Sequence, residues 1–201
     1  MQQIEIIDFI RNILAPVDKT NRYHPENIKF ACDMIYCPLV GRIANSVSDY
    51  DLDLYTKEYT SQTVTLDATK DRYYTTLPAE IVPIQGITSG IRRVANNQNF
   101  DLDFVPITEM ELEYMGGSVT QMIDTTIGYW LQRTKIWYDE SMTSAIAAAG
   151  VRLVLIPKFS SYDSTDIINI PGCSDLEFCQ AVIQLLAPTA AVDLKANNSE
   201  K

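Results

Sequence analysis

The spacing of apolar residues changes twice along the chain, and this change limits the fold more than any other feature of the sequence. Near both ends apolar residues recur every three or four positions, as on one face of an α-helix, whereas through the middle they alternate with polar residues, as on a half-buried β-strand. Amphipathic helices at the two ends cover their apolar faces most simply by packing together. The sequence therefore predicts an α+β fold: a helical bundle built from both termini (residues 1–48 and 172–195), an inserted antiparallel β-sandwich or barrel (54–170) and a flexible tail (196–201).

The expected helices have recognisable start and stop signals. Pro16 should end the first helix, and Pro25 suits the first position of the second, where its missing N–H has no intrahelical partner to lose. Pro38 lies inside the apolar stripe of that second helix and should kink or end it. Ser174 and Glu177 have the spacing of a capping box, so a third helix should begin there.

The middle of the chain contains several short strand candidates separated by turn-forming residues. These candidates are Val64–Leu66, Arg72–Leu77, Phe100–Phe104, Ile127–Tyr138 and Val151–Phe159. Short strands spaced in this way are typical of an antiparallel sandwich or barrel. One short helix should interrupt them, because Thr108 and Glu111 form a second potential capping box.

Acidic residues are concentrated in one part of the β region. The 201-residue chain has a formal net charge of −10, which argues against a basic nucleic-acid-binding surface. There is no Lys or Arg between Arg93 and Arg133, and the acids of this stretch are Asp101, Asp103, Glu109, Glu111, Glu113 and Asp124. Two interpretations stay open: simple solvation, or a surface that lies near DNA without binding it or that meets a basic partner.

Signals of enzymatic chemistry and of membrane insertion are weak. The sequence has no phosphate-binding loop, no nucleophile elbow and only one histidine, His24. The spacing of the four cysteines favours free thiols packed as small apolar groups, with no metal and no cofactor. Asp101 or Asp103 as the general base of a hydrolase is a further hypothesis. No apolar run approaches the length of a membrane helix and the first residues lack signal-peptide features, so we expect a soluble intracellular protein, or one assembled inside a cell.

Four aromatic residues crowd one expected strand pair. Tyr129 and Trp130 are neighbours, as are Trp137 and Tyr138. Because neighbouring side chains of a strand point to opposite faces, one residue of each pair should be exposed unless both faces are covered. Exposed Trp and Tyr side chains are common interface anchors, and core packing is the alternative.

The order of these elements resembles that of the head-to-tail connector proteins of tailed bacteriophages. The similar families are the neck or ring proteins of crAss-like phages and tail tubular protein A of short-tailed phages. The resemblance rests on the passage RYYTTLPAEIVPI, residues 72–84, and on the sequence INIP, residues 168–171, before the last helix. The long connection 139–150 departs from the short-tailed pattern.

The resemblance implies a structural subunit without enzymatic activity. Such subunits form a ring, commonly of twelve copies, below the portal and around the DNA exit channel, and they join the capsid to the tail. Its partners would be further copies, the portal protein and neighbouring ring or tail proteins. It would enclose DNA without sequence-specific binding, have no membrane contact, and reside in the neck of a virion assembled in the host cytoplasm.

Candidate interface residues follow from the aromatic, acidic and helical features above. They are Tyr129, Trp130, Trp137, Tyr138, Asp101, Asp103, Glu109, Glu111, Ile146, Leu186, Val192 and Leu194. We also expect the connection 139–150 and the tail from Pro188 to become ordered only on assembly. The alternative function is a carbohydrate- or protein-binding β-sandwich module of a phage fibre or adhesin, with Trp130 or Trp137 as a stacking platform.

Overall fold

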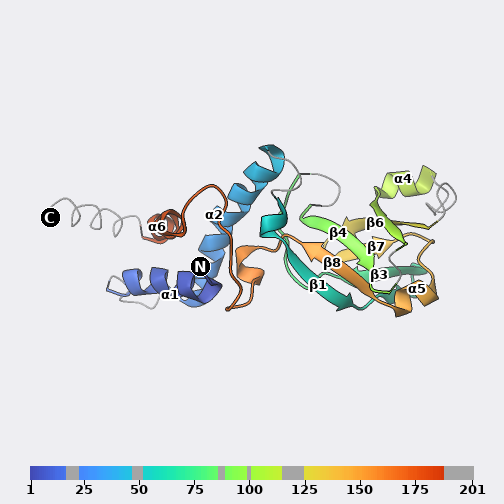
Figure 1. The fold of residues 1–201 in the computed structure, drawn as a ribbon, viewed down its shortest axis with the longest axis horizontal. Coiled ribbons are helices and arrows are strands. Elements are labelled where there is room, and N and C mark those ends of the chain that lie inside the picture. Colours follow the sequence, from blue (N-terminus) through green and yellow to red (C-terminus); the bar gives the residue numbers. More distant parts are fainter. Residues whose placement is uncertain (17–22, 47–51, 86–88, 99–100, 115–124, 188–201) are drawn as a thin grey trace. The chain divides into compact units, whose positions relative to one another are not determined.

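The chain divides into two compact units that differ in secondary structure. The computed structural model describes residues 1–16, 23–46, 52–85, 89–98, 101–114 and 125–187 (Figure 1). The helical unit comprises Met1–Tyr55 and Lys158–Lys201, and the β unit comprises Thr56–Pro157. The C-terminal boundary therefore lies before Lys158, earlier than the predicted end of the β insertion at residue 170.

Three helices from the two ends of the chain pack against one another in the helical unit, as predicted. They are α1 (Gln3–Leu14), α2 (Pro25–Ser46) and α6 (Asp175–Leu186), and the unit also contains the 3-10 helices η1 (Asp53–Tyr55) and η3 (Phe159–Ser161). Phe159 is fully buried, with its ring centroid 6.3 Å from that of Tyr36 and 5.8 Å from that of Phe178. The segment after residue 157 therefore belongs to the core of the helical unit.

The local signals define most helix boundaries. The Glu177 N–H donates to Ser174 Oγ at 3.3 Å, and the Ser174 N–H donates to Glu177 Oε2 at 2.7 Å, which completes the predicted capping box. Helix α2 begins at Pro25 but does not end at Pro38. Tyr36 and Val40, on either side of this proline, are both buried. The stability gained by burying them outweighs the one backbone hydrogen bond that the proline removes. Residues 188–195, predicted to continue the last helix, and the tail 196–201 lie outside the described residues.

The β unit contains two sheets. The first has the strand order β1 (Lys57–Gln62), β8 (Val151–Leu155), β4 (Ile91–Asn96), and the second has the order β2 (Thr65–Asp67), β3 (Arg72–Thr76), β7 (Lys135–Tyr138), β6 (Thr126–Gln132), β5 (Asp103–Pro106). Neighbouring strands are antiparallel except for β5 and β6, which are parallel, so the prediction of a purely antiparallel region is wrong. The described strands do not close into a barrel.

Two strands and one turn were not predicted. Strand β1 is rich in polar residues, and β4 contains Arg92 and Arg93 in an otherwise buried run, so neither shows clean alternation. The predicted strand Ile127–Tyr138 is a hairpin in two parts, β6 and β7, joined at Arg133, whose φ is 58°. No glycine or asparagine marks this turn, so the sequence lacked the usual signal.

One hydrophobic core joins the two sheets. Its buried residues come from both sheets and from the segment between β7 and β8, and they are Ile91, Val94, Ile127, Tyr129, Ile136, Tyr138, Met142, Ala147, Val151, Leu153 and Leu155. Two short helices accompany the sheets: α4 (Glu109–Tyr114) and α5 (Ser144–Ala148). Helix α4 starts with the predicted capping box, in which the Glu111 N–H donates to Thr108 Oγ1 at 3.1 Å. None of the helices in the described ranges has the length and apolar character needed to cross a membrane.

Candidate functional site

The four aromatic residues predicted as interface anchors are buried. Only 3% of Tyr129, 8% of Trp130, 4% of Trp137 and none of Tyr138 is exposed. The predicted alternation holds, because the strand register pairs Tyr129 with Tyr138 and Trp130 with Trp137. The two tyrosines belong to the core shared by the sheets, and the two tryptophans lie on the opposite face of the five-stranded sheet. The expectation that one member of each pair is exposed is wrong, because both faces are covered.

The face that bears Tyr74, Trp130 and Trp137 is named the tryptophan face here. Ile107 and Leu112 form one buried hydrophobic cluster with the two indoles, and the Tyr74 ring centroid lies 5.2 Å from that of Trp137. Leu112 belongs to α4, so this short helix covers part of the sheet. The Trp130 Nε1–H is buried and has no acceptor among the described residues. These contacts make the tryptophans a second, smaller core.

Cationic side chains lie over the same rings. The Lys70 Nζ is 4.2 Å from the Trp137 ring centroid, and the Lys135 Nζ is 3.7 Å from the Tyr74 centroid and 5.5 Å from that of Trp137. The Arg72 guanidinium lies 5.5 Å from the Trp130 centroid and forms an ion pair with Glu140 at 3.8 Å. In the described part of the chain, Lys70 and Lys135 have no carboxylate within ion-pair distance.

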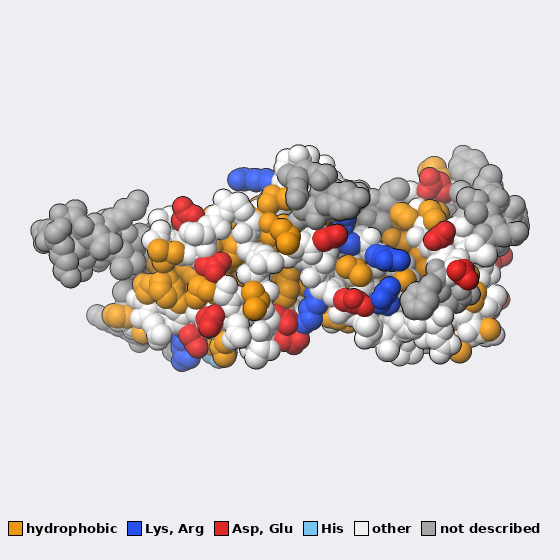
Figure 2. All heavy atoms as spheres, in the orientation of Figure 1, with side chains coloured by type: hydrophobic (Ala, Val, Ile, Leu, Met, Phe, Trp, Pro, Cys, Tyr) orange, Lys and Arg blue, Asp and Glu red, His pale blue; other side chains and the backbone are white. Residues whose placement is uncertain are grey.

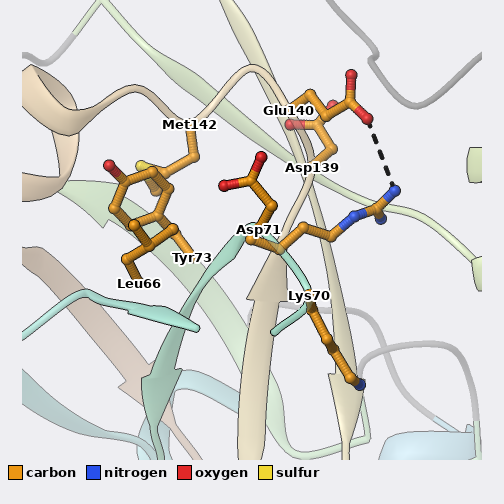
Figure 3. Close-up of a pocket in the computed structure, with 8 residues that line it drawn as sticks. Leu66, Lys70, Asp71, Tyr73, Asp139, Glu140 and Met142 are labelled. Carbon is orange, nitrogen blue, oxygen red and sulfur yellow. Dashed lines mark ion pairs between the residues drawn. The ribbon is translucent and has the colours of Figure 1, made fainter. Parts of the chain in front are cut away.

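A cavity of about 410 Å³ lies beside the β2–β3 turn. Figure 3 shows its lining: Leu66, Lys70, Asp71, Arg72, Tyr73, Asp139, Glu140 and Met142. The buried Asp139 accepts hydrogen bonds of 3.1 Å from both the backbone N–H and the hydroxyl of Ser141, and Glu140 is paired with Arg72. Since these two carboxylates are engaged in supporting the loop, the arrangement favours a structural role for this cavity.

Two of the predicted acidic residues, Asp101 and Asp103, lie at one edge of the five-stranded sheet. Asp103 begins β5, which is an edge strand, and Asp101 precedes it by two residues; both are exposed. Glu111 is exposed on α4, and hydrogen bonds from the Thr108 N–H and hydroxyl lower the pKa of its carboxyl group. Neither aspartate lines either cavity described here, so the geometry does not favour the general-base hypothesis. The side chain of Glu109 lies outside the described part of the structure.

The helical unit has an apolar groove of about 370 Å³ between α2 and α6. Its lining residues are Tyr23, Asn27, Phe30, Ala31, Met34, Leu185 and Leu186. Phe30 is 66% exposed, Met34 53% and Leu185 45%, which is unusual for such large apolar side chains. Hydrophobic side chains are also visible on the surface of this unit in Figure 2. We call this feature the apolar groove.

Only part of the apolar groove was predicted from the sequence. Leu186 was predicted as an interface residue and lines it. Phe30 and Met34 were missed, because they lie off the stripe by which α2 packs into the helical unit. Their four-residue spacing on a second helix face was the available signal. The predicted interface residues Val192 and Leu194 lie beyond the last described residue.

The connection 139–150 is part of the core of the β unit. It contains α5, and Ala147 is buried in the shared core while Ile146 packs against that core half-buried. The side-chain amides of Asn96 and Asn97 donate to the carbonyls of Ile146 and Ala149, both at 3.1 Å. The expectation that this connection becomes ordered only on assembly is therefore wrong, and Ile146 is a packing residue in the single chain.

The cysteines are free thiols, as predicted. Cys32 and Cys179 are buried, and burial raises the pKa of the Cys179 thiol to about 11. Within the described ranges, no three His, Cys, Asp or Glu side chains are grouped to hold a metal ion. His24 is exposed, and its backbone carbonyl accepts from the N–H groups of Asn27 and Ile28 at the start of α2.

Comparison with known proteins does not assign this chain to a family. No protein-family model matches it, and no curated protein matches it. Evidence on function therefore comes from the chemistry of its surfaces: the apolar groove of the helical unit, and the lysines and aspartates of the five-stranded sheet.

Proposed function

We propose that the protein is a structural subunit of a phage head-to-tail connector. Copies associate side by side into a ring, commonly of twelve subunits, which stacks below the portal, surrounds the DNA exit channel and joins the capsid to the tail. The single observation that carries this proposal is the apolar groove, because large apolar side chains gathered at a surface mark protein contacts. The resemblance of residues 72–84 to the phage families supports the same function.

The apolar groove suits a contact between copies. Phe30 and Met34 lie one helical turn apart on α2, and Leu185 lines the same groove from α6. Burial of a large apolar side chain that was exposed stabilises a complex by roughly 1.5–3 kcal/mol. Since Phe30 is only one-third buried in the single chain, most of that contribution is still available to association.

The remaining features agree with a subunit that surrounds DNA without holding it. The net charge of −10 disfavours adhesion to phosphate, so DNA would pass through the ring without sequence-specific binding. In this proposal the β unit, with two sheets around one core, is the inserted β-sandwich, and the helical unit is the bundle built from both termini. The protein acts without an active site, within the virion neck.

The adhesin alternative is not favoured by the geometry. A sugar stacks on an exposed aromatic face. Trp130 and Trp137 are 8% and 4% exposed, and they share one buried cluster with Leu112. Binding of a glycan that is lost in Trp137→Ala, with the fold intact, would reverse this conclusion.

The test measures assembly of the full chain, alone and mixed with the portal protein of the same phage. We expect rings in sedimentation velocity and in negative-stain images, and we expect Phe30→Asp/Met34→Asp to weaken assembly at least about tenfold, since charge is forced into an apolar contact. The matched control is Leu176→Asp, an exposed leucine of α6 outside the groove. A chain that stays monomeric, ignores the portal protein and is absent from purified phage particles would overturn the proposal.

A further inference from the structure

The five-stranded sheet carries opposite charges at different places, and this arrangement suggests a second contact between copies. We propose that the acidic β5 edge of one copy, with Asp101 and Asp103, binds the ammonium groups of Lys70 and Lys135 on the tryptophan face of the next copy. The partner is a second copy of this chain. This inference rests on the proposed ring function and names an interface within it.

The basic side of the contact consists of two lysines held over one aromatic row. Both ammonium groups lie within 5.5 Å of the Trp137 ring centroid, so they are no farther apart than twice that distance. Attraction between a cation and an aromatic ring places each ammonium without neutralising its charge. Lys70 is exposed, Lys135 is half-buried, and no described carboxylate pairs with either. Lys70 Nζ also donates to Gln132 Oε1 at 3.4 Å, which is a neutral partner, so both positive charges are positioned without being neutralised.

The position of Lys135 in the sheet leaves room for an incoming group. Strand β2 pairs with β3 only as far as Tyr74, whereas Lys135 is opposite Thr76 at the end of β3. At Thr76, the residue opposite Lys135, β3 is therefore no longer covered by β2 on its other side. Lys70 lies in the β2–β3 turn, at the edge of the sheet opposite β5. Both lysines are accessible from the β2 side of the sheet.

The acidic side of the contact is the β5 edge. Asp103 and Val105 are opposite Thr126 and Gly128, whereas Phe104 packs into the shared core, so the Asp103 side chain lies on the tryptophan face. Asp101 lies in the turn before β5, two residues ahead of Asp103. Both aspartates are exposed.

The two sides lie toward opposite edges of one sheet, which favours a repeating contact. When two different patches of the same chain bind each other, each copy keeps one free patch of each kind, and a closed ring results if the rotation allows it. A contact in which the same patch meets itself stops at a dimer. The arrangement of β5 at one edge and Lys70 at the other therefore suits the ring.

A nucleic acid is a less suitable partner for the two lysines. A protein surface that binds nucleic acid neutralises many phosphates at once. Here, however, the carboxylates of Asp67, Asp71 and Glu140 lie close to Lys70 and Arg72. A long polyanion would meet these carboxylates as well as the ammonium groups. Two aspartates at the β5 edge bring fewer negative charges close to these carboxylates.

Charge reversal and its rescue test the contact. In sedimentation velocity of the full chain at low salt, we expect Lys70→Glu/Lys135→Glu and Asp101→Lys/Asp103→Lys each to weaken assembly by about tenfold or more, because like charges then face each other. An equimolar mixture of the two variants should assemble beyond a dimer, since each supplies the opposite charge that the other lacks. The matched control for the single variant Lys70→Glu is Arg42→Glu, an exposed change of the same charge on α2, which should assemble normally. Lys70→Glu alone serves if the double variant fails to fold.

The outcomes separate this interface from the proposed function. If rings form and the groove variant prevents them while both charge variants assemble normally, the charge contact is wrong and the ring function stands. If the wild-type chain never assembles, both fail. A mixture that stops at a dimer would overturn the head-to-tail arrangement. Fluorescence anisotropy showing that the wild type binds duplex DNA, with binding lost in Lys70→Glu and self-assembly unchanged, would overturn the choice of partner.

Discussion

The helical unit and the β unit cover their apolar side chains in different ways. The helical unit buries one stripe of each helix and leaves Phe30 and Met34 exposed on a second face of α2. The β unit buries aromatics on both faces of its five-stranded sheet and presents charges, with Lys70 and Lys135 over the indoles. A contact through the first surface should tolerate salt, whereas one through the second should weaken with it.

The largest effect should come from the core of the β unit. Tyr138 is fully buried, and its hydroxyl donates to Thr75 Oγ1 at 3.0 Å. We expect Tyr138→Ala to lower the free energy of unfolding by about 3–5 kcal/mol, because it leaves a cavity where an aromatic ring was. Tyr138→Phe, which keeps the ring, should cost only about 1 kcal/mol. Urea denaturation followed by tryptophan fluorescence reports this unit, since both tryptophans lie in it. Equal losses for the two variants would show that the ring is not packed as described.

The second-largest effect should be a loss of stability of the β unit at alkaline pH. Burial raises the pKa of Tyr129 to about 12, whereas an unfolded tyrosine ionises near pH 10. Because the folded pKa is the higher one, the neutral tyrosine favours the folded state fully below about pH 10, and this stability is lost as the pH rises toward 12. The urea midpoint should fall across this range in the wild type and less steeply in Tyr129→Phe. An unchanged slope in Tyr129→Phe would assign the effect to other groups.

The difference between the two units also shows which features a sequence can specify. Pro25 and the pair Ser174 and Glu177 act within one helical turn, so the sequence predicted the starts of α2 and α6. Strand β1 is held by pairing with β8, far away in the chain, and its polar residues give no local sign of this. The same limit explains the parallel pairing of β5 with β6.

The candidate site was predictable to a similar extent. Alternation correctly placed Tyr129 and Trp130 on opposite faces, but burial of Trp130 depends on Leu112 from a separate helix. No spacing rule reports such a tertiary contact. The exposed carboxylate of Asp103 was predicted because alternation within a few residues decides it, and Asp101 is exposed in the turn before β5.

A smaller effect should come from the capping box of α6 in the helical unit. Ser174→Ala removes the acceptor for the Glu177 N–H and should lower the free energy of unfolding by about 1 kcal/mol. Circular dichroism at 222 nm in urea measures this loss, and Ser174→Asp should restore most of it, since aspartate also caps helices. Loss of stability in both variants would indicate that the serine hydroxyl acts elsewhere.

The smallest effect on the single chain should come from the apolar groove, and that small size is informative. Phe30 is 66% exposed, so Phe30→Ala removes few contacts that the chain makes within itself. Alanine also has a higher helix propensity than phenylalanine, by up to about half a kcal/mol, which offsets part of the loss. The urea midpoint should therefore change little, while assembly weakens. Phe159→Ala is the matched opposite, because the fully buried ring of Phe159 packs between Tyr36 and Phe178 and its loss should destabilise the helical unit. If Phe30→Ala proved as destabilising as Phe159→Ala, Phe30 would be a core residue, and the groove would carry no proposal.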